Sequence, residues 1–140
     1  MKTKLWFLVI PIALAWIALA PHLGQAQDKI NDAQIKDLAV QEMSPILKGI
    51  ESNNYEQFSK NFSDQMRKSE TPDKFGTLVA TLDKSFGQLK DPEYIGFYVK
   101  SPNIITLFKV KSSKIPDDVL IKLVLNPKES KNRVMGLWFD

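Results

Sequence analysis

The spacing of apolar residues changes once along this chain of 140 residues, close to residue 90. Before that point apolar side chains recur every three or four positions, which is the period of an amphipathic helix. After it they fall in short runs rich in β-branched and aromatic residues, which are typical of strands. All the predicted helices therefore precede all the predicted strands. This order predicts an α+β fold, because a parallel βαβ sheet needs helices between its strands.

The helical pattern occupies three segments, residues 30–50, 55–68 and 71–87. Each segment carries one apolar stripe, which indicates a helix with one buried face. In the first segment Pro45 lacks a backbone N–H, so we expect a kink or a split near Ser44. In the third segment Thr71 suits the N-cap and Pro72 the first helical position.

Four strands are predicted, over residues 94–100, 104–111, 119–126 and 133–139. Turn-forming residues fill each gap between them, and Lys90, Asp91 and Pro92 form the junction with the last helix. Because the connections are short, we expect an antiparallel meander. No repeat and no second domain are evident, so residues 27–140 are predicted to form a single domain.

Residues 1–26 have the three parts of a secretory signal peptide. Two lysines precede an uncharged apolar run over residues 5–20, and the small residues Gly24 and Ala26 suit cleavage after Ala26. The alternative is an uncleaved membrane anchor, but the run is shorter than the roughly 20 residues that a spanning helix needs. We therefore expect a periplasmic or secreted protein that keeps no stable membrane anchor after cleavage.

The chain contains no cysteine, and its one histidine, His22, lies within the predicted signal peptide. The mature domain would therefore have no disulfide and would depend on its apolar core. It would also lack the imidazole and thiol groups that Ser–His–Asp and Cys–His hydrolases and ordinary zinc sites use. We expect neither a metal site nor a cofactor.

Two of the 19 basic residues, Lys2 and Lys4, lie in the predicted signal peptide, whereas all 16 acidic residues follow it. Cleavage would leave 17 basic residues against 16 acidic ones, a formal net charge of +1 in place of +3. A charge this small does not favour binding to a phosphate backbone. We therefore expect no nucleic-acid partner.

Four segments resemble an exported bacterial family of unknown function within the nuclear transport factor 2-like (cystatin-like) superfamily. They are residues 46–58 (ILKGIESNNYEQF), 62–66 (FSDQM), 71–72 (TP) and 86–89 (FGQL). The likeness covers roughly residues 33–139. It implies N-terminal helices packed into the concave side of a curved, four-stranded antiparallel sheet. It implies no activity, because the family is uncharacterised.

A catalytic role would require an acid or base inside the cone between the helices and the sheet. The superfamily's isomerase-like and dehydratase-like enzymes place such a carboxylate on a strand. Here the acids between Tyr94 and Phe139 are Asp117, Asp118 and Glu129, and all three fall in predicted turns. We therefore expect a non-catalytic binding or protein-interaction domain, with no catalytic residue. The alternative is a small-molecule isomerase or dehydratase that uses the cone-shaped pocket.

Four aromatic residues are candidates for contacting a ligand: Tyr55, Tyr94, Tyr98 and Trp138. Tyr94 and Tyr98 are separated by an even number of positions, so we expect both on the same side of the first strand. Phenol groups orient a ligand in an apolar cavity. The alternative is ordinary packing, in which each hydroxyl bonds to water or to backbone at the edge of the core.

The third and fourth predicted strands are apolar on both faces, at residues 119–125 and 137–139. Because the helices cover one face, we expect a second copy or a ligand to cover the other. A two-fold interface through the sheet would give a homodimer. Lysines also gather in the strand half, which is typical either of a solvated surface or of a site for an anionic ligand. Besides a second copy of the chain, a small apolar or anionic ligand is therefore a possible partner of the sheet.

The signal-peptide pattern predicts that the exported protein begins at Gln27. Mass spectrometry of the protein purified from its native host measures this directly. An intact first residue in the membrane fraction would contradict cleavage and favour the membrane anchor.

Overall fold

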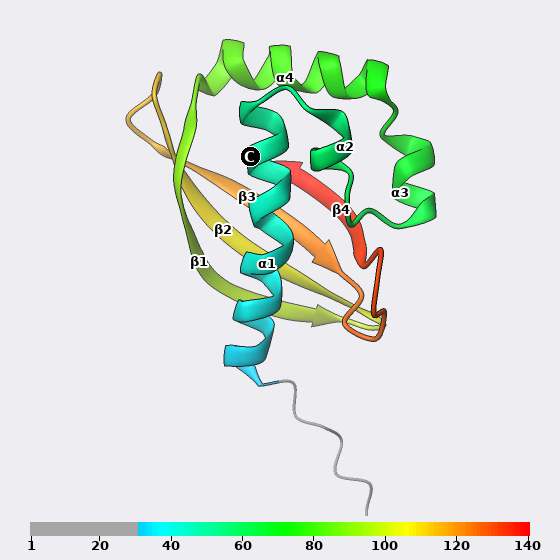
Figure 1. Ribbon diagram of the computed structural model, residues 1–140. Coiled ribbons are helices and arrows are strands. Elements are labelled where there is room, and N and C mark those ends of the chain that lie inside the picture. Colours follow the sequence, from blue (N-terminus) through cyan, green and yellow to red (C-terminus); the bar gives the residue numbers. More distant parts are fainter. Residues whose placement is uncertain (1–30) are drawn as a thin grey trace, which may run out of the picture.

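The computed structural model describes residues 31–140, so the predicted signal peptide lies outside the described residues. The elements follow in the order α1 (Asp32–Glu51), α2 (Tyr55–Phe58), α3 (Asp64–Ser69), α4 (Pro72–Phe86), β1 (Leu89–Lys100), β2 (Asn103–Ser112), β3 (Asp118–Leu125) and β4 (Val134–Phe139). The predicted α+β order is confirmed. The predicted meander is also confirmed, because the four antiparallel strands are neighbours in the order β1-β2-β3-β4 (Figure 1).

Helix α1 begins at an N-cap, where the Asn31 side chain accepts a hydrogen bond from the N–H of Ala33. Of the kink or split expected near Ser44, the split does not occur, because α1 continues through Pro45 to Glu51. Pro45 removes only the hydrogen bond to the carbonyl of Gln41, and Gln41 is exposed, so solvent can satisfy that carbonyl. One helix of 20 residues therefore spans the sheet.

The single helix predicted over residues 55–68 is instead two short helices, α2 and α3. Between them the chain pairs with β4: the N–H of Ser63 donates to the carbonyl of Val134, and the N–H of Val134 donates to the carbonyl of Asn61. Phe62 forms the corresponding isolated bridge to Val134. The Ser63 hydroxyl then caps α3 by accepting from the N–H of Met66. Pairing with a strand distant in sequence thus overrides the helical pattern.

Strand β1 also differs from its prediction, because it begins at Leu89 and not at Tyr94. The expected junction of Lys90, Asp91 and Pro92 lies within the strand as an irregularity in its pairing with β2. Proline is tolerated there because a bulged residue does not have to donate to the ladder. The other three strands agree with their predicted ranges to within one residue.

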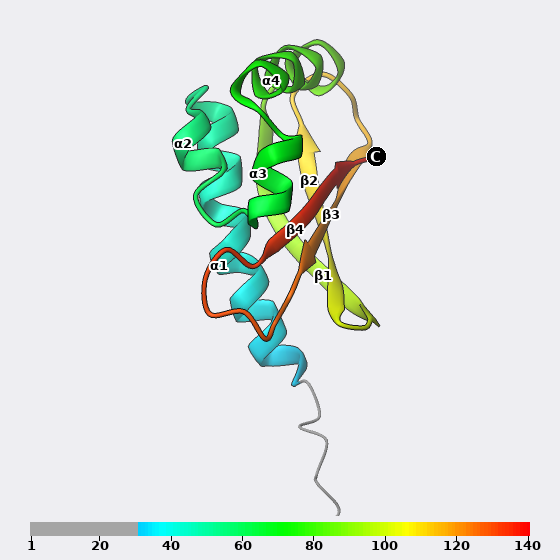
Figure 2. The same ribbon diagram turned by 90° about the vertical axis from the view of Figure 1, so that its right-hand side faces the viewer.

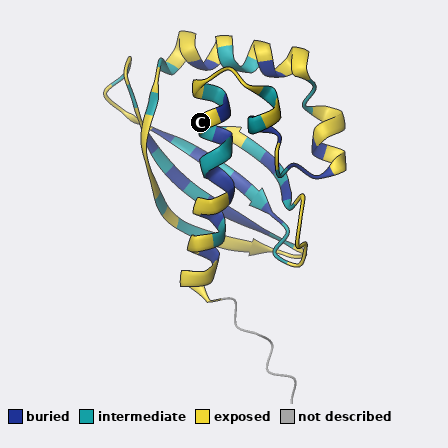
Figure 3. Cartoon of the chain, viewed as in Figure 1, coloured by how far each residue is buried: buried dark blue, intermediate teal, exposed yellow. Residues whose placement is uncertain are grey.

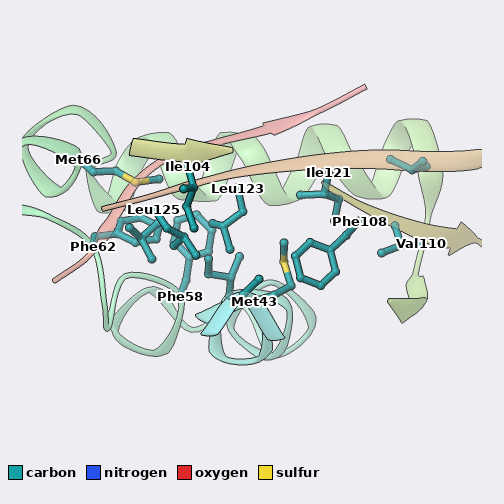
Figure 4. Close-up of a cluster of buried hydrophobic side chains, with 14 of the residues drawn as sticks. Met43, Phe58, Phe62, Met66, Ile104, Phe108, Val110, Ile121, Leu123 and Leu125 are labelled. Atoms are coloured by element: carbon teal, nitrogen blue, oxygen red, sulfur yellow. The ribbon is translucent and has the colours of Figure 1, made fainter. Parts of the chain in front are cut away.

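The core lies between α1 and the face of the sheet that it covers, which we call the inner face (Figure 4). Met43 of α1 and Phe58 of α2 pack there with side chains from β2 and β3. Along β3 the buried positions alternate with half-buried ones (Figure 3). The buried inner-face side chains of the two central strands are Ile104, Thr106, Phe108 and Val110 of β2 and Val119, Ile121, Leu123 and Leu125 of β3.

The contact between α1 and α2 predicts opposite effects for two glycine substitutions. A Cβ on Gly49 would lie 2.4 Å from the backbone nitrogen of Phe58, whereas a Cβ on Gly76 would meet nothing within 4 Å. Gly49→Ala should therefore lower the free energy of unfolding by about 1–3 kcal/mol through overpacking. Gly76→Ala, in exposed α4, should raise it by about 0.5–1 kcal/mol. Urea unfolding measures both, and equal effects would contradict the close packing at Gly49.

Candidate functional site

The face of the sheet turned away from α1, which we call the outer face, carries the candidate site. In Figure 2 no helix of the described residues lies on that side of the sheet. The strand register places two rows of residues across it: Tyr98, Ile105, Val124 and Gly136 in one row, and Gly96, Leu107, Lys122 and Trp138 in the next. A groove of about 680 Å³ lies over these rows, lined among others by Tyr98, Lys100, Ile105, Lys122, Val124 and Trp138. We call it the outer groove. Helix α3, beside β4, adds Gln65, Met66 and Ser69 to its wall.

Trp138 lies over a glycine of its own strand. A Cβ on Gly136 would approach the Trp138 indole to 2.5 Å, so the ring occupies the space that a side chain at Gly136 would need. Gly136 is buried in consequence, while Trp138 stays 54% exposed. The outer edge of the indole therefore lies close to the backbone at Gly136, and the exposed half of the side chain is left at the outer groove.

Tyr98 is the second exposed aromatic residue of the outer groove, at 50% exposure. The expectation that Tyr94 and Tyr98 share one side of β1 is wrong. Tyr94 pairs with Phe108 on the inner face and Tyr98 pairs with Ile105 on the outer face, because the register shifts between Tyr94 and Gly96. Ile95 is the extra residue at this bulge, and one extra residue reverses the side on which all later side chains lie.

Tyr55 lies apart from the outer groove and is fully engaged in packing. Its hydroxyl donates to the carbonyl of Glu70 at 2.6 Å, and its ring packs against Phe75 and Phe58. This is the arrangement expected for a tyrosine at the edge of a core.

Tyr94 is likewise engaged, and it anchors the start of α1. Its hydroxyl donates to a carboxylate oxygen of Asp32 at 3.3 Å, and its ring meets the edge of Phe108. Burial and the neighbouring Asp32 carboxylate raise the pKa of Tyr94 to about 12, so the hydroxyl remains a donor. Of the four candidate aromatics, the structure thus brings together only Tyr98 and Trp138.

Ion pairs cover the rest of the outer face. Lys109 contacts Glu93 at 3.0 Å, Lys111 contacts Asp118 at 2.5 Å, and Lys122 contacts Asp140. The hydrogen bond to Asp118 raises the pKa of Lys111, and that to Asp140 raises the pKa of Lys122. Such exposed pairs contribute little stability, but they hold the three lysine side chains in place on the outer face. Lys100, at the rim of the outer groove, takes part in none of the ion pairs found among residues 31–140.

The sequence analysis missed one buried acid, Glu42 of α1. Its side chain is 3% exposed, its Oε1 lies 3.4 Å from Nε of Arg133, and its Oε2 has no hydrogen-bond partner within the described part of the chain. Burial raises the pKa of the Glu42 carboxyl above its usual value, and Asn61, Arg133 and Lys60 lower it in part. The signal was present in the sequence, because Glu42 stands inside the apolar stripe of α1, three residues after Ala39.

The acids of the strands do not enter the core. Because β1 is longer than predicted it contains Asp91 and Glu93, and β3 begins at Asp118, but all three are exposed. The outer groove is lined neither by Glu42 nor by Arg133. Among residues 31–140 there is no group of three or more His, Cys, Asp or Glu side chains that could hold a metal ion. Within the same range no helix is both long and apolar enough to cross a membrane.

Comparison with known proteins adds no relative, because no family model, no curated protein and no solved structure matches the chain. The class that the structure defines is an α+β domain with helices packed against a four-stranded, open antiparallel sheet.

The burial of Glu42 predicts that its charge lowers stability at neutral pH. A carboxyl whose pKa is raised by folding costs stability as the pH rises from its unfolded value through its folded value. Glu42→Gln should therefore match the unchanged protein near pH 4 and exceed its thermal unfolding temperature at pH 7.

Glu129→Gln provides the matched control, because it removes the same charge from an exposed loop and should leave the pH dependence as it is. A loss of stability on Glu42→Gln that is larger at pH 7 than near pH 4 would show that the pair with Arg133 outweighs the cost of burial.

Proposed function

We propose that this chain is a non-catalytic, exported binding domain of the nuclear transport factor 2-like (cystatin-like) superfamily, and that it binds a small amphipathic anion in the outer groove. The observation that carries the proposal is the pair of exposed aromatic side chains, Tyr98 and Trp138, on a sheet face that no described helix covers. Export is proposed from the signal-peptide pattern of residues 1–26. The superfamily is proposed from the sequence segments and from the packing of helices on the sheet.

The composition of the outer groove favours a ligand with an apolar body and an anionic group. Ile105 and Val124 form an apolar floor between Tyr98 and Trp138. Lys100 places at the same groove an ammonium group that has no ion-pair partner among residues 31–140. Lys122 lines the groove as well, with its ammonium group already in contact with Asp140. Aromatic side chains that are half exposed gain about 1–2 kcal/mol each when a ligand covers the rest of their surface.

The alternative function, an isomerase-like or dehydratase-like enzyme, has one observation in its favour. Glu42 is a buried acid with a raised pKa, as a catalytic base on this fold would be. Two observations oppose it: Glu42 is paired with Arg133, and core side chains such as Met43 and Phe58 occupy the space between α1 and the sheet (Figure 4). A binding domain therefore accounts for the paired Glu42 and the filled core better than an enzyme does.

Self-association through the sheet is the second part of the proposed function. On β3, the outer-face residues Leu120 and Val124 are half-buried by their own neighbours. The outer side of that strand therefore leaves less apolar surface for a partner than its sequence predicts. Most of the large apolar residues that remain exposed lie on β1, so we place the contact between copies at that end of the sheet.

Binding of anilinonaphthalene sulfonate, a dye with two aromatic groups and one sulfonate, tests the outer groove. We expect saturable binding to the native protein, weakened about tenfold by Trp138→Ala and unchanged by Val40→Ala, which truncates an exposed apolar residue on α1. The uncharged analogue phenylnaphthylamine should bind less tightly, because it has no anionic group to pair with Lys100. Equal losses in the two variants, or no saturable binding, would contradict the proposal.

A further inference from the structure

Strand β1 is an edge of the sheet, and its outward side is unpaired. It pairs with β2 alone (Figure 1). Among residues 31–140, none of the backbone hydrogen bonds made outside the helices and strands involves residues 89–102. The other edge strand, β4, is partly covered, because Asn61 and Ser63 hydrogen bond to Val134. An edge strand with free N–H and C=O groups is a template for pairing with another strand.

Apart from the bulge at Ile95, the exposed part of β1 lacks the features that normally protect an edge. Residues 94–99 (YIGFYV) carry no charge and no proline. Five large apolar residues are exposed within the described range, and three of them are here: Ile95 at 48%, Tyr98 at 50% and Val99 at 57%. Charged residues and prolines usually interrupt such a segment. Its persistence over six positions indicates a strand that is covered in the working protein.

The register of β1 makes it complementary to a second copy of itself. Opposite residues of antiparallel strands must lie on the same face. Phe97 is an inner-face residue, opposite Thr106, and we take it as the residue through which the two-fold axis passes. Counting outward from Phe97, Gly96 of one copy then meets Tyr98 of the other, and both belong to the outer face.

The bulge at Ile95 extends this match to the ends of the strand. Because Ile95 is an extra residue, Tyr94 meets Val99 of the second copy, and both are inner-face residues. Glu93 then meets Lys100 of the second copy, and both are outer-face residues. In every pair, the two residues therefore lie on the same face of the joined sheet. Glu93 of one copy lies opposite Lys100 of the other at each end of the interface, and the opposite charges attract.

We infer that two copies of this chain associate by antiparallel pairing of their β1 edges about Phe97, which joins the two four-stranded sheets into one. The partner is thus a second copy, and the interface is isologous. Tyr98 and Lys100 line the outer groove and lie on the paired strand, so the two grooves adjoin across the interface. This inference rests on the self-association in the proposed function and is independent of the ligand.

A charge exchange tests the pairing. Sedimentation velocity of the unchanged protein over about 1–100 µM should show a monomer–dimer equilibrium. Lys100→Glu should raise its dissociation constant at least about tenfold, because Glu93 then faces a like charge at both ends. Adding Glu93→Lys to Lys100→Glu should restore the dimer. Both residues are exposed, so neither change should prevent folding. Glu93→Lys also replaces the exposed contact of Glu93 with Lys109 by a like-charge pair, which costs little stability at the surface.

Cysteine cross-linking tests the register, since the chain has no cysteine of its own. Phe97→Cys should form a disulfide-linked dimer under mild oxidation, because opposite Cα atoms of paired strands lie about 4.5–5.5 Å apart. Val99→Cys is the matched control: it lies on the same strand and face and is more exposed, but its two copies would be about 13 Å apart along the strands. It should remain monomeric on the gel.

Four results would overturn the inference: a monomer at all concentrations, a dimer that Lys100→Glu leaves intact, equal cross-linking at positions 97 and 99, or a dimer that only Trp138→Ala dissociates. The last result would place the contact between outer faces. An unchanged protein that stays monomeric but binds the dye would contradict the edge pairing and leave the ligand site standing. An unchanged protein that dimerises but shows no saturable dye binding would contradict the ligand site and leave the edge pairing standing.

Discussion

The packing of α1 across one face of the sheet is the contact on which the rest of the structure depends. The chain has no cysteine, so it must be held by noncovalent packing. Ala39, Met43 and Ile46 of α1 lie in the same buried cluster as the inner-face residues of β2 and β3. Because one long helix supplies this cover, only one face of the sheet is covered by helix. The side chains of the outer face therefore have to be covered by one another, and the residues of the proposed binding surfaces are those that this packing leaves exposed.

The outer face meets this requirement by packing along the sheet. Ile105 is only 6% exposed although no described helix lies over it, because Tyr98 and Val124 flank it in the same row. The Trp138 indole covers Gly136 in a similar way. Three ion pairs occupy the remaining part of the face. This packing leaves uncovered the two aromatic residues and the free edge of β1. A ligand or a second copy would bury the most apolar surface by covering these two regions.

The sequence was a good guide to the type and order of the elements and a poor one to contacts between distant segments. Hydrophobic periodicity is a local property, and it identified the sheet and its meander. It could not reveal that residues 61–63 leave the helical pattern to pair with Val134, because that pairing joins segments about 70 positions apart. Of the site, it identified Tyr98 and Trp138 by residue type but grouped them with Tyr55 and Tyr94. Glu42 was missed because hydrophobic periodicity identifies the apolar positions of a helix stripe and does not register a single acid among them.

A single extra residue in β1, Ile95, links the core, the outer groove and the free edge. In an uninterrupted strand Tyr94 and Tyr98 would share a face. With Tyr98 on the outer face, Tyr94 would then lie there too and would lose its contacts with Phe108 and Asp32. Glu93 and Lys100, seven positions apart, would then lie on opposite faces and could not meet across a two-fold axis. With the bulge, Tyr94 holds the start of α1 against the inner face while Tyr98 and Lys100 turn to the outer groove. Bulges commonly redirect side chains next to binding sites, and here one bulge supports both the proposed binding face and the proposed self-complementary edge.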